Sequence, residues 1–329
     1  MSNLIMGTSS YVPARVVTNQ NLLAHVDLNR FDSSLSDPYP QWGARVMDFE
    51  ERRWVDERQA PSDLGHEAAR RVLADASLDA GDSDFILVTT ITSNKKTPNT
   101  ASILQDKLGA GGRSLALADN ATSVTDFRHY TTSATFGDGA DARVLSRPDL
   151  RTYGILGSYA NSDGAKGALA EVPAGGSTLS ITCHNCQEVY DQGLQCFQLQ
   201  ARDIKDFAIE KVREATAWVL KRQRLALDDV AYVLPHQAGR RILEGVPQAM
   251  GLASSKVLSN YQKYGNISQA SIPILLDENR GLFREGDKLV LTGEGVGFGW
   301  GAMLYTWRKP ACAAMRARRY HASRWPGKA

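Results

Sequence analysis

Apolar positions along the chain follow two different periods, which predict helices alternating with strands. Residues 62–94 read "SDLGHEAARRVLADASLDAGDSDFILVTTITSN". The Ser-Asp start and the Ala-rich stretch with helical spacing predict a helix. A polar turn follows it. The continuous apolar run "FILVTTI" then predicts a strand buried on both faces, as in a parallel sheet.

The same order of elements recurs later in the chain. Residues 206–238, "DFAIEKVREATAWVLKRQRLALDDVAYVLPHQA", predict a helix, a turn and a buried strand, and this strand starts about 145 positions after the first. Residues 99–112 and 239–256 each predict a helix closed by glycine. Residues 135–145 and 297–307 each read as a glycine-rich strand. Two copies of a strand–helix unit predict an α/β chain with parallel sheets, covering helices and pseudo-twofold symmetry.

The two copies differ in length. Gly109 and Gly251 are 142 positions apart, whereas Phe136 and Phe298 are 162 apart, so the first half is about 20 residues short between these landmarks. The second half contains a helix ("QASIPILLDENRGLF") and a strand ("DKLVLTG") that have no evident counterpart in residues 114–142. We therefore expect the missing residues near 122–132. We also expect residues 118–134 to form an irregular crossing instead of a strand, a sharp turn and a helix.

Composition and charge narrow the class of protein. The 329 residues are 43% hydrophobic and 22% charged with a net charge of +2, which is typical of a soluble globular protein and favours neither nucleic acid nor a membrane surface as partner. No apolar run approaches the ~20 residues of a membrane-spanning helix, and the N-terminus does not read as a signal peptide. We expect a cytoplasmic protein. The only CxxC, Cys183 to Cys186, lacks a second ligand pair, so no metal site is predicted.

Several longer motifs resemble those of the β-ketoacyl-acyl-carrier-protein synthase III family. They are "PHQAGRRI" (235–242), "YGNISQASIPILLDE" (264–278), "GFGWGAML" (297–304) and "FGDGADA" (136–142), with support from "GTSSYVPARVVTNQNL", "FEERRWVDERQAPSDLGHEAA" and "VPAGGS". The resemblance covers about residues 4–307. It implies a thiolase-like fold, in which two duplicated α/β halves form five layers, and usually a homodimer. We expect a shortened N-terminal half at 1–160, a C-terminal half at 161–307 and a basic tail at 308–329.

The resemblance also implies an activity. The family condenses an acyl group with a malonyl thioester in fatty-acid or polyketide-type biosynthesis, using acyl-CoA and acyl carrier protein as partners and no further cofactor. A cysteine at a helix N-terminus accepts the acyl group, because the helix dipole favours the thiolate. A histidine and an asparagine then donate hydrogen bonds to the enolate oxygen formed on decarboxylation. Some relatives transfer the acyl group to an alcohol or an amine.

Two residues match the family's catalytic pair. His236 follows the predicted strand "VAYVLP", at the end where α/β folds place active sites, and Asn266 lies in "GNIS". Read without the resemblance, His236 is a buried core histidine and Asn266 a residue that caps the next helix.

Other positions match substrate contacts of the family. Arg241 matches a contact to carrier protein or to a coenzyme A phosphate, and Trp42 a ring that packs on adenine, although the accompanying arginine is displaced to Arg45. The backbone at Val296 and Gly297 matches an oxyanion donor, a role that does not depend on the side chain.

The nucleophile is where the chain departs from the family. Counted from "LG" at 108–109, the family cysteine falls on Thr122, with Ser123 beside it. A hydroxyl needs an adjacent base, and the helix that would present it is predicted to be absent. Thr122 is therefore a doubtful nucleophile that also reads as a linker residue, and Cys183 and Cys186 are poor replacements.

Three functions remain open at this point. The first, which we adopt, is a synthase III-type acyltransferase or condensing enzyme. The second is a malonyl thioester decarboxylase without an acyl-enzyme step. The third is a non-catalytic partner subunit or an internally deleted pseudo-enzyme.

Overall fold

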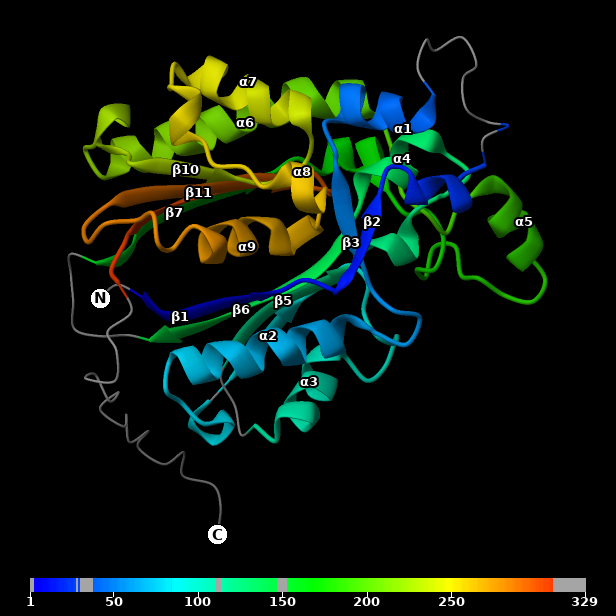
Figure 1. The fold of residues 1–329 in the computed structure, drawn as a ribbon, viewed down its shortest axis with the longest axis horizontal. Helices are drawn as coiled ribbons and strands as arrows, with labels where there is room; N and C mark the ends of the chain where they lie inside the picture. Colours follow the sequence, from blue (N-terminus) through cyan, green and yellow to red (C-terminus); the bar gives the residue numbers. More distant parts are fainter. Residues whose placement is uncertain are drawn as a thin grey trace.

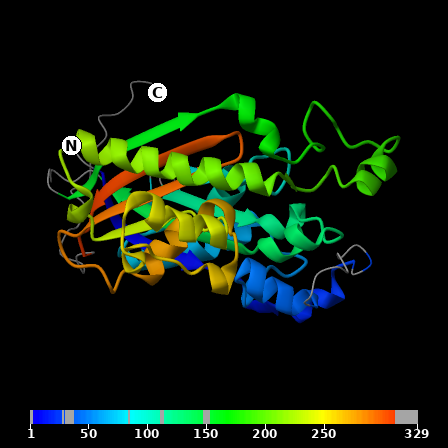
Figure 2. The ribbon, with the colours of Figure 1, turned by 90° about the horizontal axis from the view of Figure 1, so that it is seen from above.

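A computed structural model describes residues 3–27, 29, 38–83, 85–110, 114–146 and 153–309. The basic tail therefore lies almost wholly outside the described residues. Figure 1 shows two sheets separated and covered by helices, with α6 and α7 on one outside face, α9 between the sheets, and α2 and α3 on the other outside face. In the view from above, α6 runs along the sheet beneath it (Figure 2). This order makes five layers.

Within the part of the chain that the structure describes, the strands form two four-stranded sheets and two short hairpins. The first sheet has the order β1-β6-β5-β4 and the second the order β10-β11-β12-β7. The hairpins are β2-β3 and β8-β9. The bounds of the strands are β1 Leu4–Tyr11, β2 Arg15–Thr18, β3 Glu51–Trp54, β4 Ile86–Thr89, β5 Ser114–Asn120, β6 Asp138–Ser146, β7 Gly154–Ser162, β8 Ala170–Glu171, β9 Gln198–Leu199, β10 Tyr232–Pro235, β11 Lys288–Gly295 and β12 Gly299–Thr306.

The predicted helices are all present, although α6 begins before the stretch from residue 206 that predicted it. The helices are α1 Tyr39–Trp42, α2 Pro61–Asp75, α3 Thr100–Leu108, α4 Tyr130–Thr135, α5 Cys186–Gln192, α6 Ala201–Arg222, α7 Arg240–Met250, α8 Tyr261–Tyr264 and α9 Ser271–Glu278. The glycine closures are confirmed: Gly109 caps α3 at φ 60° and Gly251 caps α7 at φ 70°, a left-handed conformation that favours glycine.

The duplication predicted from the sequence is confirmed by the sheets, but the expectation of parallel sheets was wrong, because each described sheet is mixed. In the first sheet β1 pairs antiparallel with β6, β6 pairs antiparallel with β5, and β5 pairs parallel with β4. In the second sheet β7 pairs antiparallel with β12, β12 pairs antiparallel with β11, and β11 pairs parallel with β10. On this basis β1, β4, β5 and β6 correspond to β7, β10, β11 and β12. The two sheets divide the chain between Ser146 and Gly154. The boundary expected at 160/161 instead falls inside β7, which belongs to the second sheet.

The same correspondence corrects the position of the shortening. Between α7 and β11 the chain has 37 residues, 251–287, which include α9, whereas only five residues, 109–113, join α3 to β5. The turn after β5 is longer than its counterpart, with 17 residues (121–137) against three (296–298). The net difference agrees with the predicted shortfall. Its location at 122–132 was wrong, because β5 occupies the sheet position of β11 and the loss therefore precedes β5.

The expected irregular crossing is present in part. β5 runs regularly to Asn120, and a 3₁₀ turn, Ala121–Val124, and the six-residue α4 then lead to β6. In the described residues no counterpart of α9 packs on the first sheet from the central layer.

The core forms separately in each outer layer and around α9. Leu64 and Val72 of α2 pack on Ala140 of β6, and Val219 of α6 packs on Val290 and Leu304 of the second sheet. In the central layer Leu275 of α9 joins Leu4 and Leu234 in one cluster that links both sheets. Burial on both sides of the second sheet explains the apolar run of β10. The prediction that "FILVTTI" is buried on both faces was wrong, because β4 is an edge strand of the described first sheet and Phe85 and Leu87 are 59% and 47% exposed.

A fully buried arginine ties the β2-β3 hairpin to the segment after β5. The guanidinium of Arg52 donates to the Val17 carbonyl at 3.2 Å, to Asn19 Oδ1 at 2.9 Å and to the Ala134 carbonyl at 3.1 Å. It also lies over the Phe49 ring. Burial lowers the pKa of Arg52 to about 10, so the group stays charged at neutral pH.

Replacing this arginine should destabilise the protein. Arg52→Ala leaves three acceptors without their donor in a buried place, and we expect it to lower the free energy of unfolding by about 3 kcal/mol. Urea denaturation of Arg52→Ala beside the exposed-site variant Arg58→Ala measures this difference. A loss below about 1 kcal/mol would show that water satisfies the acceptors.

Candidate active site

His236 stands directly after β10, where the strand leaves the sheet. Its backbone N–H donates to the Thr292 carbonyl of β11 at 2.9 Å, which continues the parallel ladder by one residue. The ring is half-buried and its Nδ1 lies 2.7 Å from Ser271 Oγ, at the start of α9. The position at the C-terminal end of a parallel strand is the one that the sequence predicted.

The hydrogen bonds of Ser271 bear on which ring nitrogen of His236 carries the proton. Ser271 Oγ accepts from the Gln237 N–H at 3.3 Å and lies 2.7 Å from Nδ1 of His236, so its hydroxyl can donate to Nδ1. In the neutral tautomer that accepts this bond, the proton sits on Nε2. Burial lowers the pKa of His236 to about 4, so this ring is neutral at pH 7 and acts as a hydrogen-bond donor, not as a cation.

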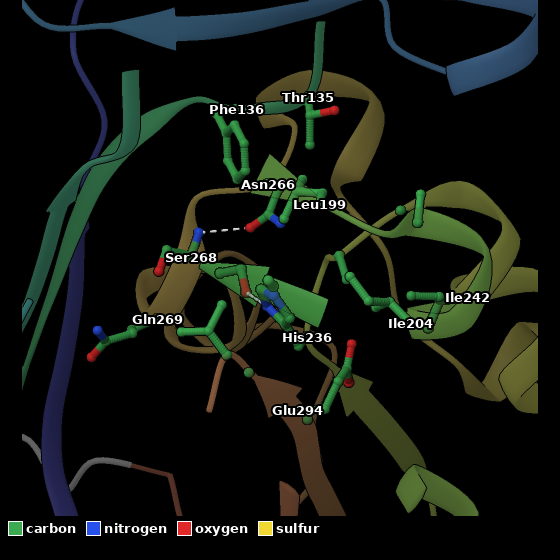
Figure 3. A pocket seen from close by; sticks show the side chains of 18 of the residues that line it. Thr135, Phe136, Leu199, Ile204, His236, Ile242, Asn266, Ser268, Gln269 and Glu294 are labelled. Carbon is green, nitrogen blue, oxygen red and sulfur yellow. Dashed lines mark hydrogen bonds between the residues drawn. The ribbon is translucent and has the colours of Figure 1, made fainter. Parts of the chain in front are cut away.

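Asn266 is oriented by backbone contacts between the two halves. Its N–H donates to the Thr135 carbonyl at 2.9 Å and its carbonyl accepts from the Gly137 N–H at 3.1 Å. Its side-chain Oδ1 accepts from the Ser268 N–H at 2.8 Å, which leaves Nδ2 as the group available to a ligand. Figure 3 shows this bond, the His236–Ser271 bond, and both side chains at the same cavity.

Two glycines allow this crossing. Gly265 has φ 68°, and a Cβ there would lie 2.7 Å from the Thr135 carbonyl oxygen. A Cβ on Gly137 would overlap the Tyr264 carbonyl oxygen. Each glycine is therefore required by close approach of the opposite backbone.

A cavity of about 1750 Å³ brings together most of the predicted residues. His236, Asn266, Trp42, Arg241 and Val296 all line it. Gly297, the other predicted oxyanion position, adjoins Val296 in the turn between β11 and β12. The cavity reaches from α7, past the start of α9, to β7 and β12 of the second sheet.

The side chains predicted to contact the substrate differ in solvent exposure. Arg241 is exposed at the first turn of α7. Trp42 is only 5% exposed and stacks with Tyr39 at 6.0 Å between ring centroids, so little of its ring is open to an adenine. The carbonyl of Arg45, the displaced arginine, accepts from Arg240 at 2.9 Å.

Thr122 is not among the residues that line the cavity. It lies in the 3₁₀ turn after β5, where its N–H and Oγ1 bond to the buried Asp138 carboxyl at 2.9 and 2.7 Å. Ser123 is exposed and donates to the Asn120 carbonyl. Neither hydroxyl starts an α-helix, so the structure gives them a role in holding this turn.

The three cysteines among the described residues also lie away from the cavity lining. Cys183 and Cys186 are exposed beside α5, and Cys196 is buried, which raises the pKa of its thiol. Cys312 is outside the described residues. No group of three or more metal-ligating side chains occurs within the described ranges. Within the same ranges, no helix has the length and apolar character needed to cross a membrane.

The sequence analysis missed two residues of this site. Ser271 orients His236, and Glu294 projects a carboxyl group into the cavity from the end of β11 (Figure 3). Burial raises the pKa of Glu294 to about 7. A signal for Glu294 was available, because it interrupts the apolar run "KLVLTGEGVGFGWGAMLYTW" with a carboxylate next to the predicted oxyanion segment.

Comparisons with known proteins agree with the fold and with the order of motifs. Residues 220–307 match the model of the 3-oxoacyl-[acyl-carrier-protein] synthase III C-terminal region. Two curated relatives are β-ketoacyl-[acyl-carrier-protein] synthases III. That of Caldanaerobacter subterraneus is 33% identical over 93% of this chain and 98% of its own length, and that of Clostridioides difficile is 31% identical over 92% and 98%.

Solved structures of synthases III have the same fold as this chain. The synthase III of Pseudomonas aeruginosa superimposes with a TM-score of 0.81 at 26% identity, over 94% of this chain and 99% of that one. The synthase III of Aquifex aeolicus gives 0.79 at 27% identity, over 93% of this chain and 100% of that one. The fold is therefore that of the thiolase-like condensing enzymes, and the chain belongs to the β-ketoacyl-acyl-carrier-protein synthase III family.

The alignment lengths agree with the short connection before β5. The match to the Caldanaerobacter protein spans 338 positions but covers 93% of the 329 residues here, so about 30 positions are opposed by gaps in this chain. The difference between the 37-residue and five-residue connections is of the same size.

The hydrogen-bonding pattern around His236 predicts its tautomer and titration. We expect nitrogen NMR shifts of a neutral ring protonated at Nε2 from pH 8 down to about 5, with protonation only near pH 4. In Ser271→Ala the preference for Nε2 should weaken, because Nδ1 loses its donor. Exposed His184 serves as an internal control. Ordinary titration of His236 near pH 6.5 would contradict the assignment.

Proposed function

We propose that this chain binds acyl and malonyl thioesters in the cavity and acts as a synthase III-type condensing enzyme or acyltransferase. The observation that carries the proposal is the pair of oriented donors, His236 Nε2–H and Asn266 Nδ2–H, at one cavity. Donors held in place before reaction stabilise an oxygen on which negative charge develops. On a malonyl thioester this oxygen belongs to the enolate that forms when carbon dioxide leaves.

The cavity offers groups suited to the rest of such a substrate. Arg240 and Arg241 line it at the N-terminal turn of α7, where positive charge favours phosphate groups. Ile204, Leu199 and Ile242 give it apolar walls that suit an acyl chain or a pantetheine arm. Acyl-CoA and acyl carrier protein are the partners that we propose, and no cofactor is needed for these steps.

The decarboxylation step can be tested without an acyl donor. Wild-type protein should release carbon dioxide from malonyl-CoA, and His236→Ala or Asn266→Asp should lower the rate about 100- to 1000-fold, because each removes one donor to the enolate oxygen. Radiolabelled malonyl-CoA measures the release. His184→Ala, at an exposed site, is the matched control. Equal rates in all four proteins would refute the role of the pair.

We also propose a homodimer in solution, as the resemblance implies. The described part of the first sheet ends in edge strand β4, and around it Phe85 is 59% exposed, Leu87 47% and Ile91 40%, a cluster that a second copy would cover. Sedimentation equilibrium at micromolar concentration should give twice the 36.0 kDa chain mass. Leu87→Lys should shift the distribution toward single chains, and a single-chain mass for the wild type would reject the dimer.

A further inference from the structure

The carboxyl group of Glu294 lines the cavity but has no part in the proposed role of His236 and Asn266. It stands on β11 opposite Trp300 of β12, two residues before the turn of residues 296–298. Figure 3 shows it rising toward the space that His236, Ile204 and Ile242 border. It therefore lines the same cavity as His236 and Asn266.

The charge state of Glu294 is set by its surroundings. Burial raises its pKa to about 7, and its own backbone N–H opposes this shift. Charged groups from several elements line the same cavity, and most are paired among themselves or with a neighbour. These are Lys205 with Asp206, Arg240 with Glu244, Arg143 with Asp141, Arg128 with Asp126, and Arg241 on α7. None of them contributes to the shift of Glu294.

A carboxylate of this kind complements two fixed oxyanion donors. Acyl transfer from a thioester needs donors for the carbonyl oxygen and a base for the attacking group, and a base works best when its pKa is near the working pH. No cysteine is among the residues that line the cavity. A base beside the donors would let an acceptor attack the thioester directly.

We propose that Glu294 is a catalytic general base for direct transfer of the acyl group from a thioester to the hydroxyl group of a small alcohol, or of water, without an acyl-enzyme. This inference rests on the proposed role of His236 and Asn266 as donors to the thioester oxygen.

The step balances in atoms and charge. The Glu294 carboxylate takes the proton from the acceptor hydroxyl as its oxygen bonds to the thioester carbon. The carbonyl electron pair moves onto the oxygen held by His236 Nε2–H and Asn266 Nδ2–H. When the C=O bond re-forms, the C–S bond breaks, and the leaving thiolate takes the proton from Glu294. With an alcohol as the acceptor, the products are an ester and a free thiol. With water as the acceptor, they are a carboxylic acid and a free thiol.

The experiment measures thiol release from acetyl-CoA or hexanoyl-CoA, which carry no second carboxylate to lose. Wild type should release thiol, faster when a primary alcohol such as butanol is added, with the ester seen by mass spectrometry. Glu294→Gln should lower the rate about 100-fold or more, a typical contribution of a general base. Glu67→Gln, on the outer helix α2, is the matched control. Equal rates in wild type and Glu294→Gln would overturn the proposal.

The pH profile tests the base itself. A base works only when ionised, so wild-type activity should fall as pH drops through about 7, and Glu294→Gln should lack this step. A profile that rises toward acid, or a step that survives in Glu294→Gln, would contradict the assignment.

Stability gives a readout that does not depend on turnover. Above about pH 7 the folded protein holds a half-buried charge that the unfolded chain holds in water, so stability should fall as pH rises from about 4.5 to 7. Glu294→Gln should therefore melt at a higher temperature than wild type at pH 8.5 and at the same temperature at pH 4. Equal melting at both would refute the buried carboxyl.

The two proposals can fail separately. Carbon dioxide release that depends on His236 and Asn266, with no Glu294-dependent thiol release, would reject the base and keep the proposed function. If neither carbon dioxide release nor thiol release depends on His236 and Asn266, both the proposed function and the role of Glu294 are rejected.

Discussion

The close backbone crossing between residues 135–137 and 264–266 is the contact on which the site depends. Asn266 bonds through its backbone to Thr135 and Gly137, and the glycines at 137 and 265 are the positions where a Cβ would collide with the opposite chain. This crossing joins the end of the turn after β5 to the loop that leads into α9. It therefore sets the position of Asn266 relative to His236, which its own sheet holds in place through the bond to Thr292.

The shortened half shows how much of a duplicated fold can be lost while such a site is kept. The loss before β5 removes elements of the central layer, but all four strands of the first sheet keep the order and direction of their counterparts. The crossing at 135–137 follows β5, so the loss does not include it. In consequence, the pair from the second half still faces residues of the first half across one cavity.

Burial shifts the pKa values of His236 and Glu294 in opposite directions inside this cavity. Burial keeps His236 neutral, so that with Asn266 it offers donors without a fixed charge, whereas burial keeps the Glu294 carboxyl close to the point where it exchanges its proton at neutral pH. The same physical cause, removal from water, lowers one pKa and raises the other because the charged forms have opposite sign. The proposed donors come from the end of β10 (His236) and from the loop before α9 (Asn266), and the proposed proton-transfer group from near the end of β11 (Glu294).

The duplication, the buried strand β10, the glycine-capped helices and the positions of His236 and Asn266 could be predicted from the sequence, because they depend on local periodicity and on short motifs. The exposure of β4 could not, because it depends on which strand lies at the edge of the sheet. The size of the shortfall was also predictable from spacing. Its place was not, since only strand pairing shows that β5 takes the position of β11. Spacing likewise put the family's nucleophile position on Thr122. In the structure the Thr122 hydroxyl donates a hydrogen bond to the Asp138 carboxyl in a turn. The roles of Ser271 and Glu294 depend on groups far apart in the chain and on exclusion of water, and tertiary packing alone decides both.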